Sequence, residues 1–463
     1  MDLRGGRSGV RPKGPDGPGV SAATASYAGP STTGGPPRGR GARRTWIVLL
    51  LAVACAAVFL TALPDGDDDR ESGPACAATT VASSAPEPKL TGAFASYGDD
   101  GARTDDWTGG DGTHSVKLPD GRVLWLFSDT FLGQVHAPPN PQGQPHAWRD
   151  TSAPMVRNSG VVTDRSGALE RTLPTPMFAD PAPEQWRWPV AAKVEPRSPG
   201  GDEDVLRVLL WTRAKAPGPW IYGAPAATEV ATLSLPDLRV ENITQISDQR
   251  GVADPEKRVL YGTTTVDDGE WTYVFGGTDA QAAARPSSHA FVARVPHGGL
   301  ADPDAWRYWD GSDWTRTGKP RPVLGNGAHK GVGSAFTVVR TQGTYVLLTM
   351  AAGTEGLTDV TSYWSCSPTG PWRGPAKAFA PPLPQDGGGN GGGGGTGGQS
   401  AAGTAAAPYN PQVHPAVSGG GRLVVSYDVN WLDAAAANAQ AHINRNVELY
   451  RPRFVSLRFQ RES

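Results

Sequence analysis

Short apolar runs separated by turn residues recur along most of the chain, and the clearest pair lies at 109–118 and 123–130. The sequence Pro-Asp-Gly-Arg stands between these two runs. Proline presets φ at the second position of a tight turn, and Asp-Gly tolerates the chain reversal. Because the flanking runs are rich in β-branched, aliphatic and aromatic residues, the pattern predicts a β-hairpin.

This hairpin brings two aspartates together. A turn centred on residues 120 and 121 places Asp111 opposite Asp129 or Thr130, and directly opposed side chains have Cβ atoms about 4.5–5.5 Å apart. Two carboxylates this close raise at least one pKa, so that one carboxyl can donate a proton while the other stays ionised. Glycoside hydrolases need this arrangement. The alternative is that both aspartates are turn formers where strands end.

The same pattern recurs four more times and predicts a repeated all-β architecture. The further hairpins cover 186–211, 261–277, 329–350 and 409–429, and equivalent positions are 69 to 80 residues apart. Such a period, with further short strands in each interval, is typical of propeller blades, which close into a ring because one blade cannot bury its own faces. We therefore expect a five-bladed β-propeller over 91–463. A β-sandwich or a two-domain β protein is the alternative.

Two segments of the expected propeller depart from the repeat. The last apolar run, 448–459, is expected to complete a blade with an N-terminal strand near 93–97. Residues 384–407 are Gly-rich and predict a flexible surface loop.

The N-terminal 63 residues predict a membrane anchor. Residues 1–44 hold eight Lys/Arg and two Asp/Glu with few large apolar residues, which predicts a disordered cytoplasmic segment. Residues 45–63 are apolar and just long enough to cross a bilayer, and basic residues precede them while acidic residues follow. The expected protein is thus a single-pass cell-membrane protein whose propeller is extracellular, joined by a linker at 64–90. Secretion after signal-peptide cleavage is the alternative.

Composition narrows the function further. The net charge of −2 provides no basic field, which excludes a nucleic-acid-binding function. Of the three cysteines, Cys55 lies in the apolar segment, whereas Cys76 and Cys366 lie outside it, where a disulfide can persist. Their pairing is one expectation, and free thiols are the other.

A propeller brings one end of each central hairpin to a common funnel, so the candidate site residues can be collected from these ends. The catalytic candidates are acidic: Asp111, Asp129, Asp428 and Glu355. The substrate-binding candidates are aromatic, amide and imidazole side chains: Trp107, His114, Trp188, Asn158, His329, Asn410, His414 and Asn430. The alternatives are that the tryptophans pack between blades and that His414 is satisfied in the wall.

No cofactor is expected, because no cluster has zinc-ligand spacing and no nucleophile elbow occurs in the sequence. The alternative is a cation held at the axis by His414 or His329.

The segment 111–131, Asp-Gly-Thr-His-Ser-Val-Lys-Leu-Pro-Asp-Gly-Arg-Val-Leu-Trp-Leu-Phe-Ser-Asp-Thr-Phe, resembles the first blade of secreted actinobacterial propellers. Segments 158–160, 367–372, 409–415 and 450–453 fit the same family. The resemblance covers about 91–460 and extends to five-bladed furanosidase-type glycoside hydrolases, including endo-D-arabinanase-like enzymes. It implies cleavage by axial carboxylates, with Asp111 and Asp129 at the matching positions. The Glu general acid usual in related furanosidases has no unambiguous counterpart in the middle blades.

The sequence thus predicts an extracellular glycoside hydrolase-like propeller that acts on a cell-wall polysaccharide, with arabinan as one candidate. Asp111 is expected to be the base or nucleophile and Asp129 the acid or a pKa tuner, with Asp428 and Glu355 as further candidates for the acid. The alternative is a non-catalytic propeller that binds a glycan or a wall protein.

Overall fold

The computed structural model describes residues 76–103, 107–218, 220, 222–279, 288–325, 331–350, 359–384, 405–432 and 436–462. The predicted segments 1–44 and 45–63 lie outside these ranges, as do Glu355, His329 and most of 384–407. Within the described part of the chain, no helix is both long enough and apolar enough to span a membrane.

Five sheets of four or five antiparallel strands make up most of the described residues. Sheet 1 contains β3 (His114–Lys117), β4 (Val123–Phe127), β9 (Ser159–Thr163) and β10 (Leu169–Thr172). Sheet 2 contains β11 (Gln185–Pro196), β12 (Asp204–Ala214), β13 (Ala224–Leu233) and β14 (Val240–Asp248). Sheet 3 contains β15 (Leu260–Asp268), β16 (Trp271–Gly277), β17 (Ala290–Pro296), β18 (Arg307–Trp309) and β19 (Trp314–Thr315).

Sheet 4 contains β20 (Phe336–Thr341), β21 (Thr344–Met350), β22 (Val360–Ser365) and β23 (Arg373–Phe379). Sheet 5 contains β24 (Ala405–Val413), β25 (Leu423–Leu432), β26 (Arg453–Arg461) and, at its outer edge, β1 (Thr79–Pro86). Two smaller sheets are formed by β2 (Trp107–Gly110), β5 (Thr130–Leu132) and β8 (Met155–Val156), and by β6 (Val135–His136) and β7 (Trp148–Arg149). The described helices are α2 (Pro88–Gly98), α3 (Ala436–Arg445) and the short η1 (Pro255–Lys257), η2 (Pro303–Ala305), η3 (Pro415–Val417) and η4 (Val447–Tyr450).

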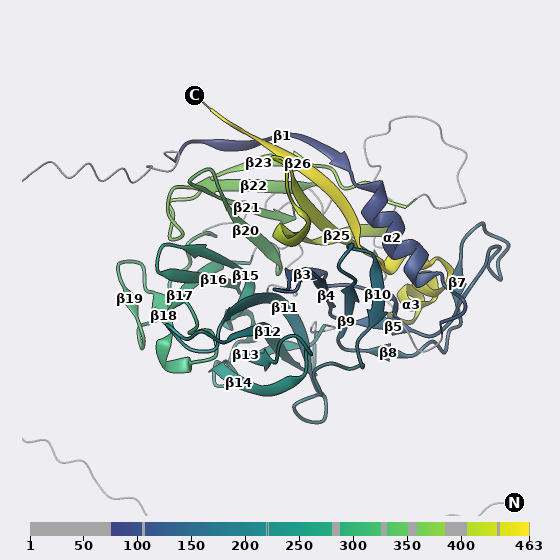
Figure 1. Cartoon of the computed structure of the whole chain (residues 1–463), viewed down its shortest axis with the longest axis horizontal. Helices are drawn as coiled ribbons and strands as arrows, with labels where there is room; N and C mark the ends of the chain where they lie inside the picture. The colour runs from purple at the N-terminus through teal and green to yellow at the C-terminus, as the bar shows by residue number, and fades with distance from the viewer. Residues whose placement is uncertain are drawn as a thin grey trace, which may run out of the picture. The chain divides into compact units, whose positions relative to one another are not determined.

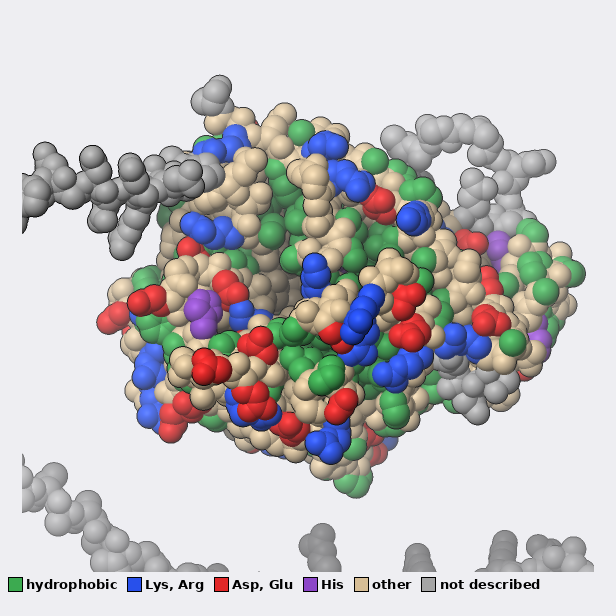
Figure 2. All heavy atoms as spheres, in the orientation of Figure 1, with side chains coloured by type: hydrophobic (Ala, Val, Ile, Leu, Met, Phe, Trp, Pro, Cys, Tyr) green, Lys and Arg blue, Asp and Glu red, His purple; other side chains and the backbone are tan. Residues whose placement is uncertain are grey.

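The five sheets surround one axis in a propeller-like arrangement (Figure 1). The strands β3, β11, β15, β20 and β24, one from each sheet, line a common cavity of about 560 Å³. Figure 2 shows the surface hollowed at the centre of this ring, with acidic and basic side chains mixed over β14 to β19. Each of the five predicted hairpins is present as two paired strands at one edge of a sheet.

Alternating side chains explain why the sheets form a ring. Leu206 and Leu210 on β12 pack with sheet 1, whereas Leu209 and Trp211 on the same strand pack with sheet 3. Successive residues of a strand point to opposite faces, so both faces of a sheet are buried when a neighbouring sheet lies on each side. Further apolar clusters join sheet 3 to sheet 4, sheet 4 to sheet 5, and sheet 5 to sheet 1.

The N-terminal part of the fold differs from the sequence prediction. The partner of β26 is β1, not the predicted strand at 93–97, and β1 lies inside the stretch expected to be a linker, 64–90. Residues 93–97 belong to α2, where Phe94 and Tyr97 are three positions apart and both buried. That spacing puts both rings on one helical face, and Phe94 packs against Trp125 and Phe454. Figure 1 shows β1 alongside β26, so the two ends of the described chain meet in sheet 5.

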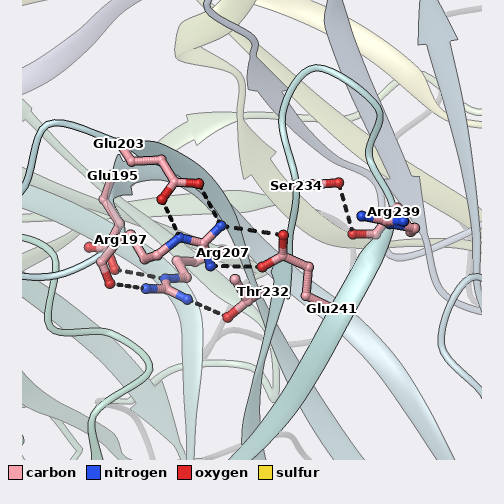
Figure 3. Close-up of polar contacts among 8 residues, drawn as sticks. All are labelled: Glu195, Arg197, Glu203, Arg207, Thr232, Ser234, Arg239 and Glu241. Carbon is pink, nitrogen blue, oxygen red and sulfur yellow. Dashed lines mark hydrogen bonds and ion pairs between the residues drawn. The ribbon is translucent and has the colours of Figure 1, made fainter.

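A buried ion pair fixes sheet 2 to sheet 3. Glu195 on β11 is 2% exposed and lies 3.3 Å from the guanidinium of Arg207 on β12. The same carboxylate accepts the backbone N–H groups of Gly298 and Leu300, which follow β17. Figure 3 shows this pair beside the more exposed ion pairs that Arg197 forms with Glu203 and Glu241.

A disulfide joins Cys76 to Cys366, with Cα atoms 5.5 Å apart, so the predicted pairing is confirmed. The bond connects the residues before β1 with the residue after β22, and therefore ties the outer edge of sheet 5 to sheet 4. Ala77 reinforces this attachment, because its N–H and C=O both hydrogen-bond to the Thr344 hydroxyl.

We expect the double variant Cys76→Ser/Cys366→Ser to lose about 2–5 kcal/mol of unfolding free energy, because the unfolded chain gains the freedom of an opened loop. Urea unfolding under non-reducing conditions measures the loss, and Cys55→Ser is the control. An unchanged urea midpoint in the double variant would contradict the expectation.

Candidate active site

Asp111 and Asp129 face each other at the end of the first hairpin. The backbone N–H of Asp111 donates to the Asp129 carbonyl at 3.1 Å. The pairing of β3 with β4 and the Gly110–Thr130 pair of β2 and β5 have the same register, in which residue 111 opposes residue 129. The two carboxyl groups therefore lie on the same side of the hairpin, as the turn at 119–122 predicted.

Asp111 lies in an environment that favours its protonated form. Burial raises the pKa of Asp111 well above its usual value, and the charges of Asp129 and Asp428 raise it further. The hydroxyl of Tyr409, which donates to Asp111 Oδ2 at 2.8 Å, and the hydroxyl of Tyr450 oppose this rise in pKa without reversing it.

Asp129 has partners that favour its ionised form. Trp188 Nε1 donates to Asp129 Oδ1 at 2.8 Å, and Arg157 Nη1 lies 3.0 Å from Oδ2. Burial raises the pKa of Asp129 above its usual value, and the charge of Arg157 and both hydrogen bonds oppose this rise without reversing it. The two facing carboxyl groups thus differ in their surroundings, and this difference separates a proton donor from a carboxylate.

Asp428 is buried behind this pair. It is 1% exposed and accepts the N–H of Gly112 and the hydroxyl of Thr113, both at 2.8 Å, and the amide of Asn410 at 3.4 Å. Burial raises the pKa of Asp428 to about 7 despite these donors. These contacts fix Gly112 and Thr113, the two residues after Asp111, and so help to position Asp111. The charge of Asp428 also raises the pKa of Asp111.

Gly112 is required in this turn. Its φ is +63°, and a Cβ at this position would lie 2.4 Å from the Ser128 hydroxyl. The pairing of β24 with β25 is irregular between Tyr409 and Gln412, and Asn410 has a φ of +47°. This irregularity lets the consecutive residues Tyr409 and Asn410 contact Asp111 and Asp428 respectively, which a regular strand would not allow.

The structure brings Asp111, Asp129, Asp428, Trp188 and Asn410 of the predicted site together. Asn430 lies two residues after Asp428 on β25 and accepts the N–H of Trp431.

Two predicted substrate-binding residues are packing residues instead, and the structure corrects both assignments. Trp107 is 1% exposed and packs against Phe94 and Phe127 in the cluster between sheets 5 and 1. Asn158 is fully buried, and its amide bonds to both backbone groups of Phe178 and to the Arg187 carbonyl. These side chains cannot reach a ligand in the funnel.

The two described histidines of the predicted site are buried near the axis. His114 lines the axial cavity, and burial lowers its pKa to about 3. His414 is fully buried, with Nδ1 2.9 Å from the Ser115 hydroxyl and its ring 5.0 Å from that of Trp125. Burial, with a smaller effect of His114, lowers the pKa of His414 to about 3. Across the described ranges, no group of three or more His, Cys, Asp or Glu could hold a metal ion.

Three residues that contact the aspartates were missed by the sequence analysis: Tyr409, Tyr450 and Arg157. The position of Arg157 follows from strand pairing beyond the first hairpin, which the hairpin pattern did not specify. The register of β9 against β4, and of β8 against β5, places residue 157 directly opposite Asp129. The prediction chose Asn158, and a shift of one residue along a strand moves the side chain to the opposite face.

The raised pKa of Asp428 predicts that the stability of the fold depends on pH. A carboxyl whose pKa is about 7 in the folded state and 3.8 in the unfolded chain stabilises the fold below pH 4, and this stabilisation is lost as the pH rises to 7. The buried His114 and His414 act in the opposite direction, because their lowered pKa values cost stability as the pH falls below 6.5.

Comparing Asp428→Asn with the unmodified protein isolates the contribution of Asp428 to this pH dependence. We expect the variant to gain unfolding free energy relative to the unmodified protein as the pH rises from 4 to 8, by up to roughly 4 kcal/mol. Urea unfolding at each pH measures the difference, and a difference that is constant over this range would contradict the expectation.

The family and structural comparisons are consistent with this architecture. Residues 95–459 match the family model described as a domain of unknown function, DUF5005. The chain belongs to the DUF5005 family. No curated protein matches this DUF5005 chain.

Several solved structures are similar to the DUF5005 chain. A Bacteroides ovatus ATCC 8483 protein, assigned as a hydrolase, is 18% identical with a TM-score of 0.57, and the match covers 81% of this chain and 90% of that one. An α-L-arabinofuranosidase from Podospora anserina is 10% identical with a TM-score of 0.41, covering 76% and 91%. The Coprinopsis cinerea GH62 α-L-arabinofuranosidase is 13% identical with a TM-score of 0.41, covering 77% and 92%. The similarity to the Bacteroides ovatus protein supports the fold of the DUF5005 chain. The function has to be inferred from the residues of the candidate site.

Proposed function

We propose that this protein is a glycoside hydrolase that cleaves a polysaccharide with Asp111 and Asp129. The observation that carries the proposal is that these carboxyl groups face each other across one hairpin in unequal surroundings. Asp111 is the proton donor, and Asp129, held by Arg157 and Trp188, is the carboxylate that acts as nucleophile or base. This assignment is the reverse of the one expected from the sequence.

In the same proposal, each of the five sheets is one blade of a five-bladed propeller, and the carboxylates lie at one end of its axis. The enzyme acts outside the cell on cell-wall polysaccharide, attached to the membrane through 45–63. Arabinan is the first substrate to test, because 111–131 resembles the first blade of furanosidase-type propellers.

The direct experiment is to incubate the full chain with arabinan and a panel of other polysaccharides and to measure the release of reducing sugar. We expect release from at least one furanose-containing polymer. Proton NMR of the first-formed product then gives its anomeric configuration, which distinguishes retention from inversion.

A second candidate function is glycan binding without cleavage. The observation that favours it is a pair of accessible aromatic side chains. Trp188 is half-buried and donates to Asp129, and Tyr222 is 47% exposed and precedes Gly223, whose carbonyl bonds to the Arg213 guanidinium over Trp188. Retention of a polysaccharide in affinity electrophoresis, without sugar release from any polymer, would support this function and contradict hydrolysis.

A further inference from the structure

Arg213 is a buried cation next to the candidate active site. It lies near the end of β12, is 1% exposed, and its guanidinium bonds to Asp279 at 2.6 Å and to the carbonyl of Gly223. Asp279 follows β16 in sheet 3, so Arg213 connects the inner end of sheet 2 to the next sheet.

Arg213 also supports the indole that binds Asp129. Its guanidinium carbon lies 5.3 Å from the ring centre of Trp188, whose Nε1 donates to Asp129. In the β11–β12 register Arg213 opposes Trp186, so Trp188 is its diagonal neighbour. A cation over an indole face is attracted by the ring's quadrupole, and the attraction is strongest where water is excluded.

The same guanidinium fixes the residue after Tyr222. Gly223 has a φ of +75°, and its carbonyl accepts from Arg213. Tyr222 directly precedes this glycine and is 47% exposed, so the contacts from Gly223 through Arg213 to Trp188 place it on the Asp129 side of the site. Burial and the charge of Asp111 raise the pKa of its phenol, which agrees with this position. An accessible aromatic face next to acidic groups suits the stacking of a sugar ring.

We propose that Arg213 is a positioning residue that holds Trp188 against Asp129 and fixes the backbone at Gly223, and that Tyr222 is the sugar-stacking wall of the site. The ligand class is a neutral sugar ring whose apolar face lies on the phenol. This inference rests on the proposed function, because it assigns a binding wall and a support to the same carboxylates.

The test of the positioning role is a double-mutant cycle. Arg213→Met lowers kcat by roughly 10- to 100-fold, since a small displacement of a reacting group is enough for such a loss. It also moves the acidic limb of the kcat/KM profile to higher pH, because Asp129 loses a hydrogen bond that lowers its pKa. Trp188→Phe, which lacks the N–H, produces the same shift, and combining the two variants adds little.

Effects that add fully in the double variant would overturn the positioning role. If Arg213→Met does not fold, Arg213→Lys replaces it, because lysine keeps a charge for Asp279 but lacks the planar fork of donors. With this variant we expect a smaller pH shift of the same sign. The matched control is Lys215→Met, two residues further on, whose exposed ion pair with Glu184 lies outside the site, and its kinetics stay unchanged.

The stacking wall is tested with Tyr222→Ala. We expect KM to rise roughly tenfold, the equivalent of about 1.4 kcal/mol, with kcat unchanged. An unchanged KM would overturn the assignment of Tyr222.

Failure of the proposed function can be distinguished from failure of this inference. The NMR signal of the Trp188 indole N–H reports the ionisation of Asp129 in the free protein, without any substrate. We expect its titration midpoint to be higher in Arg213→Lys than in the unmodified protein. An unchanged midpoint would overturn the positioning role even if the enzyme proves active, whereas the expected shift supports it even if no polysaccharide is cleaved.

Discussion

Asp111→Asn lowers kcat for polysaccharide cleavage by about 10²–10⁴-fold, because the variant loses the proton donor for the departing sugar oxygen. The side-chain amide keeps the size of the carboxyl group and its contact with Tyr409, so the turn at Gly112 stays in place. Initial rates of reducing-sugar release measure the loss, and thermal unfolding verifies that the variant is folded. Asp120→Asn, in the turn of the same hairpin, is the control, and its activity stays unchanged.

Substrates with different leaving groups separate the roles of the two aspartates. A nitrophenyl glycoside needs little protonation of its leaving oxygen, so Asp111→Asn loses much less activity on it than on the polysaccharide. Asp129→Asn loses activity on both substrates, because the attacking carboxylate is required in each case. If Asp129→Asn instead shows the leaving-group dependence, the roles are reversed. Full activity of Asp111→Asn on the polysaccharide would remove Asp111 from the mechanism.

Glu195→Ala loses about 3–5 kcal/mol of unfolding free energy, because it leaves the buried charge of Arg207 without its carboxylate. The variant also removes the acceptor of two backbone N–H groups, those of Gly298 and Leu300. Urea unfolding at pH 7 measures the loss. Glu203→Ala is the matched control from the same polar network, because its ion pair with Arg197 is exposed, and we expect an unchanged midpoint. Equal midpoints for the two variants would contradict this assignment of the buried pair.

Local chemistry was sufficient to predict the strands. In each of the five hairpins, turn residues separate two apolar runs. In the structure these two runs are strands that pair with each other in antiparallel orientation. There are two exceptions: β1, which lies in the stretch expected to be a linker, and the segment containing Phe94 and Tyr97, where a short apolar run is compatible with a strand or a helix. Burial of both rings on one face of α2 decided between the two.

The sequence predicted which hairpin ends contribute to the candidate site, but it predicted individual contacts only within one hairpin. The opposition of Asp111 and Asp129 follows from the turn at 119–122, and the structure has this register. The partners of the pair come from far along the chain: Tyr409 is 298 residues from Asp111, and Asp428 is 316 residues from Gly112. Nothing in the spacing of those residues specifies how the last sheet packs against the first.

By itself, the sequence determined the all-β hairpins and the opposition of Asp111 and Asp129, because these depend on turn geometry and on the two-residue period of a strand. Only the tertiary structure decided the rest. Closing the sheets into a ring buried Trp107 and Asn158, and it placed Trp188 and Arg157 on Asp129 and Tyr409 on Asp111. The physical reason is that desolvation and charge at the site come from several sheets at once, and these sheets meet only when the ring is complete.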